Sequence, residues 1–114
     1  MDIENTKAQM RKGILEYCIL SILSGNSCYA SDIIKGLKEG KVIVVEGTLY
    51  PLLTRLKNAG LLSYRWEESQ QGPPRKYYEL TSQGEKYLAE LDGSWNDLVE
   101  SVGLLRKNKS DKSK

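Results

Sequence analysis

The chain has 114 residues, of which 39% are hydrophobic and 28% charged, and this composition fits one soluble globular domain. No run approaches the roughly 18 consecutive apolar residues of a membrane span, and the N-terminus lacks the layout of a signal peptide, so we expect a cytoplasmic protein. The chain contains no histidine, which excludes Ser-His and Cys-His catalytic arrangements. We therefore expect no enzymatic activity, no metal site and no cofactor.

Charge is unevenly distributed along the chain. The net charge is +2, but the last nine residues, RKNKSDKSK, hold five Lys or Arg against one Asp, so residues 1–105 are slightly acidic. A domain whose only task was to grip phosphate would be more basic. The two cysteines, Cys18 and Cys28, are too few to staple the domain, and we expect both to pack as small hydrophobic residues.

The first predicted element is a helix with one apolar stripe. The stripe consists of Ile14, Leu15, Cys18, Ile19, Ile22 and Leu23. The helix should end at the Ser-Gly-Asn turn of residues 24–26. A short second helix should begin near Ser31 or Asp32 and end near Gly40. Residues 41–46, KVIVVE, read as a short extended run.

A third helix is predicted by a stripe of four leucines and should end at Gly60. The stripe consists of Leu49, Leu52, Leu53 and Leu56. The opposite face is neutral and polar, with Tyr50 and Arg55 on its flanks, whereas an ordinary solvated face would carry Glu/Lys pairs. Proline is comfortable only in the first turn of a helix, so Pro51 predicts either a late start near Thr48 or a kink.

A β-hairpin should follow the third helix. Residues 61–67 alternate apolar and polar side chains, and residues 76–80 form a return strand rich in β-formers. Tyr64 and Trp66 are expected to belong to the core. The loop at 69–74, SQQGPP, contains two prolines that cannot donate hydrogen bonds, so we expect strand pairing to stop there and the tip to project.

The last predicted helix begins with Thr81 as its N-cap and carries the most regular pattern in the chain. Its heptad stripe consists of Leu88, Leu91, Trp95, Leu98, Val102 and Leu105. The earlier stripes can bury one another within the domain, so this stripe needs a further surface. A second copy of the chain would supply that surface, which makes these six residues the predicted dimer interface.

This order of elements predicts a mostly α (α+β) fold. Residues 1–80 would form a winged helix-turn-helix domain, 81–107 a dimerisation helix, and 108–114 a basic, disordered tail. In such a fold the third helix enters the major groove of DNA, and the hairpin tip follows the neighbouring backbone or minor groove.

Two motifs carry a family resemblance. "EGTLYPLLTRLKNAGLL" and "GPPRKYYELTSQGEKYL" resemble segments of the PadR family of bacterial transcriptional regulators, and the similarity covers residues 14–92. Lys57 departs from the family pattern, which usually has an acidic residue there. A single helix after the hairpin resembles the smaller PadR subclass. The resemblance implies a homodimeric DNA-binding repressor of an inverted-repeat operator, responsive to phenolic acids, drugs or other small hydrophobic ligands.

Candidate site residues follow from these placements. The predicted DNA-binding residues are Tyr29, Ser31, Thr48, Tyr50, Thr54, Arg55, Gly72, Arg75 and Lys76. Trp95 could stack on an aromatic effector in a pocket completed by Met10, Tyr87 and Val99. Each assignment has a plainer alternative: a core-flanking position for Tyr29, wing backbone geometry for Gly72, an ordinary solvated surface for the rest of the first set, and a core residue of the dimer for Trp95. The basic tail could add DNA affinity or only solubility.

The whole chain also has an alternative interpretation. A winged-helix dimer can serve as a protein–protein interaction module without binding DNA, and the slightly acidic body of residues 1–105 favours that second hypothesis.

Overall fold

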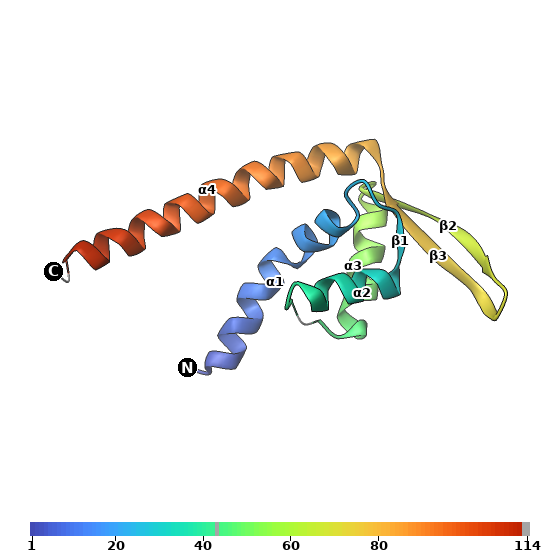
Figure 1. The fold of residues 1–114 in the computed structure, drawn as a ribbon, viewed down its shortest axis with the longest axis horizontal. Coiled ribbons are helices and arrows are strands. Elements are labelled where there is room, and N and C mark those ends of the chain that lie inside the picture. Colours follow the sequence, from blue (N-terminus) through green and yellow to red (C-terminus); the bar gives the residue numbers. More distant parts are fainter. Residues whose placement is uncertain (43, 113–114) are drawn as a thin grey trace.

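Four helices and a small antiparallel sheet make up the fold (Figure 1). The computed structural model describes residues 1–42 and 44–112, with side chains through Lys107. The elements are α1 (Ile3–Ile22), β1 (Cys28–Tyr29), α2 (Ala30–Glu39), α3 (Glu46–Asn58), β2 (Leu62–Ser69), β3 (Gly72–Leu80) and α4 (Ser82–Lys112). The predicted mostly helical winged-helix fold with a long C-terminal helix is confirmed. In the described part of the chain, no helix is both long enough and apolar enough to cross a membrane.

The core lies where α1, α2, α3 and the sheet meet. The helices contribute Leu15, Ile19, Leu20, Ile33, Leu37, Leu49, Leu53 and Leu56, and the rest of the chain adds Leu23, Cys28, Leu61, Leu62, Tyr78 and Leu88. The predicted stripes of the first three helices supply most of these side chains. Burial raises the pKa of the Cys28 thiol to about 11, because a thiolate would be desolvated there, and this supports its structural role.

α1 begins much earlier than its apolar stripe suggested. Asp2 caps it, and its carboxylate Oδ1 accepts the backbone N–H of Glu4 at 3.0 Å. The first turns of α1 are exposed, so they carry no apolar periodicity that would have marked the helix. Figure 1 shows this end of α1 extending away from the sheet.

α3 begins at Glu46, before the predicted start near Thr48, and Pro51 lies in its interior. Pro51 cannot donate to the carbonyl of Gly47, so one bond of the helix is missing near its start. The helix ends at Asn58, and the predicted capping glycine, Gly60, follows the C-cap Ala59 with φ 82°. The backbone N–H groups of Gly60 and Leu61 donate to the carbonyls of Lys57 and Leu56, the pattern of a Schellman cap.

The sheet has the order β1-β3-β2, with β3 paired antiparallel to both neighbours. The two-residue strand β1 was not predicted, whereas the extended run predicted at 41–46 forms no strand at its described residues 41, 42 and 44–46. Residue 43 lies outside the described residues. The extra strand anchors the start of α2 to the hairpin, because Tyr29 pairs with Tyr77.

The hairpin formed by β2 and β3, which we call the wing, differs from the prediction at its tip. Pairing does not stop before the prolines: Glu67 pairs with Arg75 and Ser69 with Gly72. Pro73 and Pro74 therefore lie opposite the single residue Glu68, in a β-bulge. A bulge accommodates residues that cannot donate to the ladder, so the paired wing is longer than expected.

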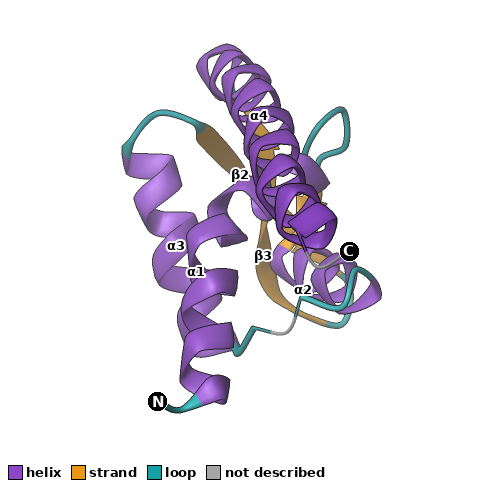
Figure 2. Ribbon diagram, turned by 90° about the vertical axis from the view of Figure 1, so that its left-hand side faces the viewer, coloured by secondary structure: helices purple, strands orange, loops and turns teal. Residues whose placement is uncertain are grey.

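α4 starts at the predicted cap and then leaves the domain. The hydroxyl of Thr81 accepts the backbone N–H of Gly84 at 2.9 Å and donates to the carbonyl of Gly60 at 2.6 Å. Figure 2 looks along α4 and shows it projecting from the domain that α1, α2, α3 and the sheet form. The helix runs to Lys112, past the predicted boundary at residue 107, and residues 113–114 of the predicted tail lie outside the described residues.

Candidate nucleic-acid interface

A groove of about 420 Å³ opens where the start of α2, the outer face of α3 and the wing converge. We call it the wing groove. It is lined by Tyr29, Ala30, Ser31, Tyr50, Trp66, Pro74, Arg75, Lys76 and Tyr78. Five of the nine predicted DNA-binding residues therefore meet on one surface, although they come from three separate segments of the chain.

Arg75 ties the wing to the start of α2. Its Nη2 donates to the hydroxyl of Ser31 at 2.5 Å, and its guanidinium lies 4.0 Å from the centroid of the Tyr29 ring. Tyr29 in turn packs edge-on against Tyr77, with ring centroids 4.9 Å apart. A guanidinium has further N–H groups beyond the one used by Ser31, so Arg75 can hold this geometry and still bind a phosphate.

Lys76, the next residue along β3, lies on the face of the wing opposite to Arg75. Its ammonium lies 4.5 Å from the centroid of the Tyr64 ring and 5.5 Å from that of Trp66. Aromatic faces attract a cation without neutralising it. The charge of Lys76 is therefore positioned but available to an anion.

A smaller groove of about 90 Å³ extends this surface along α3. It shares Lys76 and Tyr78 with the wing groove and adds Thr54, Lys57 and Asn58. Thr54 is thus placed as predicted, on the face of α3 that looks toward the wing. The ammonium of Lys57 lies 5.8 Å from the centroid of the Tyr64 ring, which adds a further cation to the surface.

Three predicted DNA-binding residues lie elsewhere. Thr48 lines a different groove, with α1 and the segment before α3. Arg55 points to α1, where its Nη1 lies 3.1 Å from Oε1 of Glu16. Gly72 pairs with Ser69 at the far end of the wing, outside both grooves, and its φ is not positive, so the backbone there does not require glycine.

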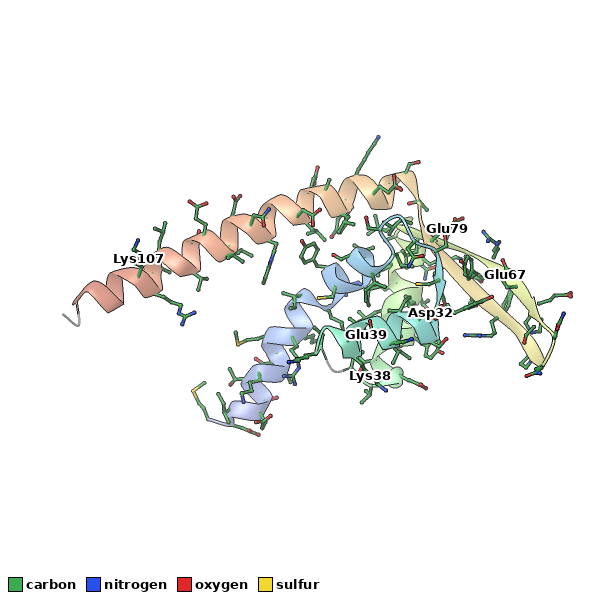
Figure 3. The ribbon with its side chains drawn as sticks, in the orientation of Figure 1. Asp32, Lys38, Glu39, Glu67, Glu79 and Lys107 are labelled. Atoms are coloured by element: carbon green, nitrogen blue, oxygen red, sulfur yellow. The ribbon has the colours of Figure 1, made fainter. Side chains whose placement is uncertain are left out.

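Acidic groups limit the positive character of this surface. Asp32 accepts the backbone N–H of Tyr29 at 3.0 Å and so places a carboxylate in the first turn of α2. Arg65 donates from Nε to Glu67 at 2.7 Å, and this hydrogen bond raises the pKa of the guanidinium. Figure 3 shows Asp32 at the start of α2 and Glu67 along the wing. Free positive charge is therefore concentrated at Arg75, Lys76 and Lys57.

A second, apolar groove lies between the diverging ends of α1 and α4, and we call it the arm groove. It has a volume of about 420 Å³ and is lined by Met10, Trp95, Leu98, Val99, Val102, Gly103 and Arg106. Three of the four predicted ligand-binding residues therefore come together. Tyr87 does not line it.

Trp95 and Tyr17 mark the point where α1 and α4 separate. Their ring centroids are 6.1 Å apart, and the Tyr17 hydroxyl donates to Oδ1 of Asp92 at 2.5 Å. This bond to the carboxylate raises the pKa of Tyr17 above its ordinary value. The hydrogen bond between Tyr17 and Asp92 joins the two helices across 75 positions in the sequence.

The predicted dimer stripe on α4 divides into two parts. Leu88 is 6% exposed and belongs to the core of the domain, and Leu91 packs against that core. This corrects the placement of Leu88 at a dimer surface, because the first turns of α4 still cover the domain. The remaining members, Trp95, Leu98, Val102 and Leu105, are exposed.

Comparison with known proteins decides the family. Residues 19–90, well over half of the chain, match the Transcriptional regulator PadR-like family. The chain belongs to the PadR family. A PadR-like transcription factor of Bacteroides fragilis is 64% identical, with coverage of 89% of this chain and 98% of the other and a TM-score of 0.76. A PadR family regulator of Eggerthella lenta is 33% identical, with 90% of each chain covered and a TM-score of 0.82.

A more distant PadR structure is relevant because it contains bound DNA. Bacillus subtilis PadR, solved in complex with operator DNA, is 27% identical to this chain, with a TM-score of 0.63. The similarity covers 68% of this chain and 46% of the longer Bacillus subtilis protein. Membership of the PadR family makes this chain a transcriptional regulator rather than an enzyme.

Two residues that line the wing groove or the smaller groove beside it are absent from the predicted DNA-binding set of this PadR-family protein. Lys57 was noticed only as a departure from the family pattern, although its position between Thr54 and Asn58 on the outer face of α3 was a usable signal. Trp66 was predicted to be a core residue and is 61% exposed in the wing groove.

Proposed function

We propose that this regulator is a homodimeric repressor that binds an inverted-repeat operator in the cytoplasm and is released by a small hydrophobic or aromatic ligand. We also assign it to the small PadR subclass, because α4 is the one helix that follows the wing among the described residues. The observation that carries DNA binding is the wing groove, with its convergence of Tyr29, Ser31, Tyr50, Arg75 and Lys76.

The chemistry of this surface suits a DNA duplex. The outer face of α3 offers Tyr50, Thr54 and Asn58, which can hydrogen-bond to base edges without repelling the phosphates. Arg75 and Lys76 lie beside that face and can bind the backbone that borders the major groove. The operator complex of Bacillus subtilis PadR supports the same use of the fold here.

The proposed dimer and ligand response depend on α4. Exposed apolar side chains continue along it beyond the domain, and a second copy would bury them from water. The arm groove is apolar and has an indole at its inner end, a setting that favours flat aromatic molecules.

One observation favours the alternative of a protein-interaction module without DNA binding. On the wing, Glu67 pairs with Arg65 and Glu79 also acts on that guanidinium, while Asp32 adds a carboxylate to the first turn of α2 (Figure 3). Such a mixed-charge surface also suits a protein partner.

We expect Tyr50→Ala, and separately Arg75→Ala with Lys76→Ala, to weaken binding to a duplex from the promoter of the chain's own gene. Tyr50→Ala should cost about tenfold in affinity, since it removes one base or backbone contact. The double variant should make the negative slope of log K against log salt shallower by about 2, because two phosphate contacts are lost. Titrations by fluorescence anisotropy from about 50 mM salt upward measure both quantities.

Lys86→Ala provides the matched control, since it removes an exposed cation on α4 outside the wing groove. It should bind like the wild type. If the wild type does not bind the promoter at low salt, the protein-interaction alternative replaces the DNA proposal.

A further inference from the structure

Trp66 is exposed because the aromatic stripe of β2 is longer than the core beneath it. Leu62, Tyr64 and Trp66 alternate along one face of β2. Leu62 is buried and Tyr64 packs against the core, but Trp66 is 61% exposed. A strand rises about 3.3 Å per residue, so each step of two residues carries the side chain farther from the domain. Trp66 is the first member of the stripe without core beneath it.

The indole is nevertheless held in a defined position. Tyr64 meets it edge-on, with ring planes at 89° and centroids 6.0 Å apart. Lys76 is its cross-strand partner, and the Lys76 ammonium lies 5.5 Å from the indole centroid. Because these neighbours restrict the ring before any partner binds, contact with a ligand costs little side-chain entropy.

The surroundings of Trp66 identify a polyanionic, partly apolar partner. It lines the wing groove together with Tyr50 of α3 and the cations Arg75 and Lys76. An ammonium beside an apolar ring matches the alternation of phosphate and deoxyribose along a DNA strand. An indole exposed in a groove beside two cations offers such a strand a flat apolar surface for contact.

We propose that Trp66 is a direct DNA contact of the wing, with its indole packed against deoxyribose and base edges at the minor groove. This inference rests on the proposed DNA-binding function and assigns it a further residue. Lys76 holds the adjoining phosphate, while Trp66 contributes apolar contact that does not depend on charge.

Salt dependence separates the two kinds of contact. Trp66→Ala should weaken promoter binding about tenfold at every salt concentration and leave the slope of log K against log salt unchanged. Lys76→Gln should make that negative slope shallower by about 1, because one phosphate contact is lost. Trp66→Phe should retain most of the affinity, since it keeps an aromatic face.

The two tryptophans of the chain allow a direct probe. Promoter DNA should change the tryptophan emission of the wild type. Most of that change should be lost in Trp66→Phe, in which only Trp95 emits. Far-UV circular dichroism and thermal unfolding should show both Trp66 variants folded, as expected for an exposed side chain.

Ile3→Ala is the matched control, because Ile3 is 62% exposed but lies at the start of α1. It should bind the promoter like the wild type. The inference is overturned if the wild type binds and folded Trp66→Ala binds equally well, an outcome that leaves DNA binding itself intact. Failure of the wild type to bind instead rejects the proposed function, and the contact assigned to Trp66 with it.

Discussion

At the scale of single residues, Trp95 combines two environments. One side of it meets Tyr17, which is hydrogen-bonded to Asp92, and the other side borders the arm groove. With 39% of its surface exposed, Trp95 is neither buried in a core nor fully solvated. This position favours contact with a ligand that enters between α1 and α4.

We predict that planar aromatic compounds quench Trp95. In Trp66→Phe protein, where Trp95 is the sole emitter, titration with a phenolic acid and with a planar aromatic dye should give saturable quenching. Trp95→Ala should weaken binding of the same probe about tenfold by calorimetry, since a stacking surface is lost. Equal affinity in Trp95→Ala would remove the stacking role and leave Trp95 as a packing residue of the dimer.

The residues whose environment was predicted wrongly share one cause. Trp66 and Leu88 both continue regular apolar patterns. Such a pattern indicates which side chains lie on the same face of an element, but not how far along that element the core extends. Trp66 lies beyond the core along β2, whereas Leu88 still lies above it on α4. For Arg55, the helical period correctly predicts the side of α3 on which it lies. It does not predict the ion-pair partner, because Glu16 belongs to another helix.

At the scale of elements, the junction of α3, β2 and α4 is a close contact that leaves no room for a side chain at Gly84. The Thr81 N–H donates to the carbonyl of Leu61 at 3.1 Å, and its hydroxyl donates to that of Gly60. The first turn of α4 then lies so close to β2 that a Cβ at Gly84 would overlap the Leu61 carbonyl oxygen. This contact fixes the start of α4 relative to the wing.

We predict opposite effects for two substitutions in α4. Gly84→Ala should lower the free energy of unfolding by about 1–3 kcal/mol, because the backbone of Leu61 or of α4 must shift. Gly93→Ala meets no atom within 4 Å and should raise the free energy by up to about 1 kcal/mol through helix propensity. Urea titration at one fixed protein concentration measures both. Equal effects would show that the junction can relax without cost.

Elements were predictable where their signals are local. The leucine stripe, the cap at Gly60 and the cap at Thr81 lie within short windows, and the structure has all three. The strand β1 was not predictable, because its two residues gain their conformation from pairing with Tyr77 and Tyr78, far along the chain. The two motifs shared with PadR proteins identified the fold even though β1 could not be predicted.

At the scale of the whole molecule, α4 gives the protein an extended shape. The longest dimension is 64 Å against 32 and 22 Å for the others, and Figure 1 shows α4 forming most of that length. Leu98, Val102 and Leu105 are exposed on it. An isolated subunit would leave this apolar surface in water, which is the physical case for a dimer.

We predict that Val102→Glu with Leu105→Glu converts a dimer into a monomer. Two carboxylates buried in the interface would be desolvated without partners. Sedimentation equilibrium should give twice the chain mass for the wild type and the chain mass for the variant. The variant should also lose operator affinity, because its two DNA-binding domains are no longer linked. Leu104→Glu, on the opposite side of α4, should remain dimeric. A monomeric wild type would contradict the proposal.

The proline bulge of the wing has a consequence for self-association. β1 pairs only with Tyr77 and Tyr78, so among the described residues the outer part of β3 has a partner on one side alone. An open strand edge can template the addition of a strand from another molecule and so begin aggregation. Pro73 and Pro74 carry no N–H group, and their bulge bends the strand. The bulge therefore hinders the addition of a strand from another molecule along the outer part of β3.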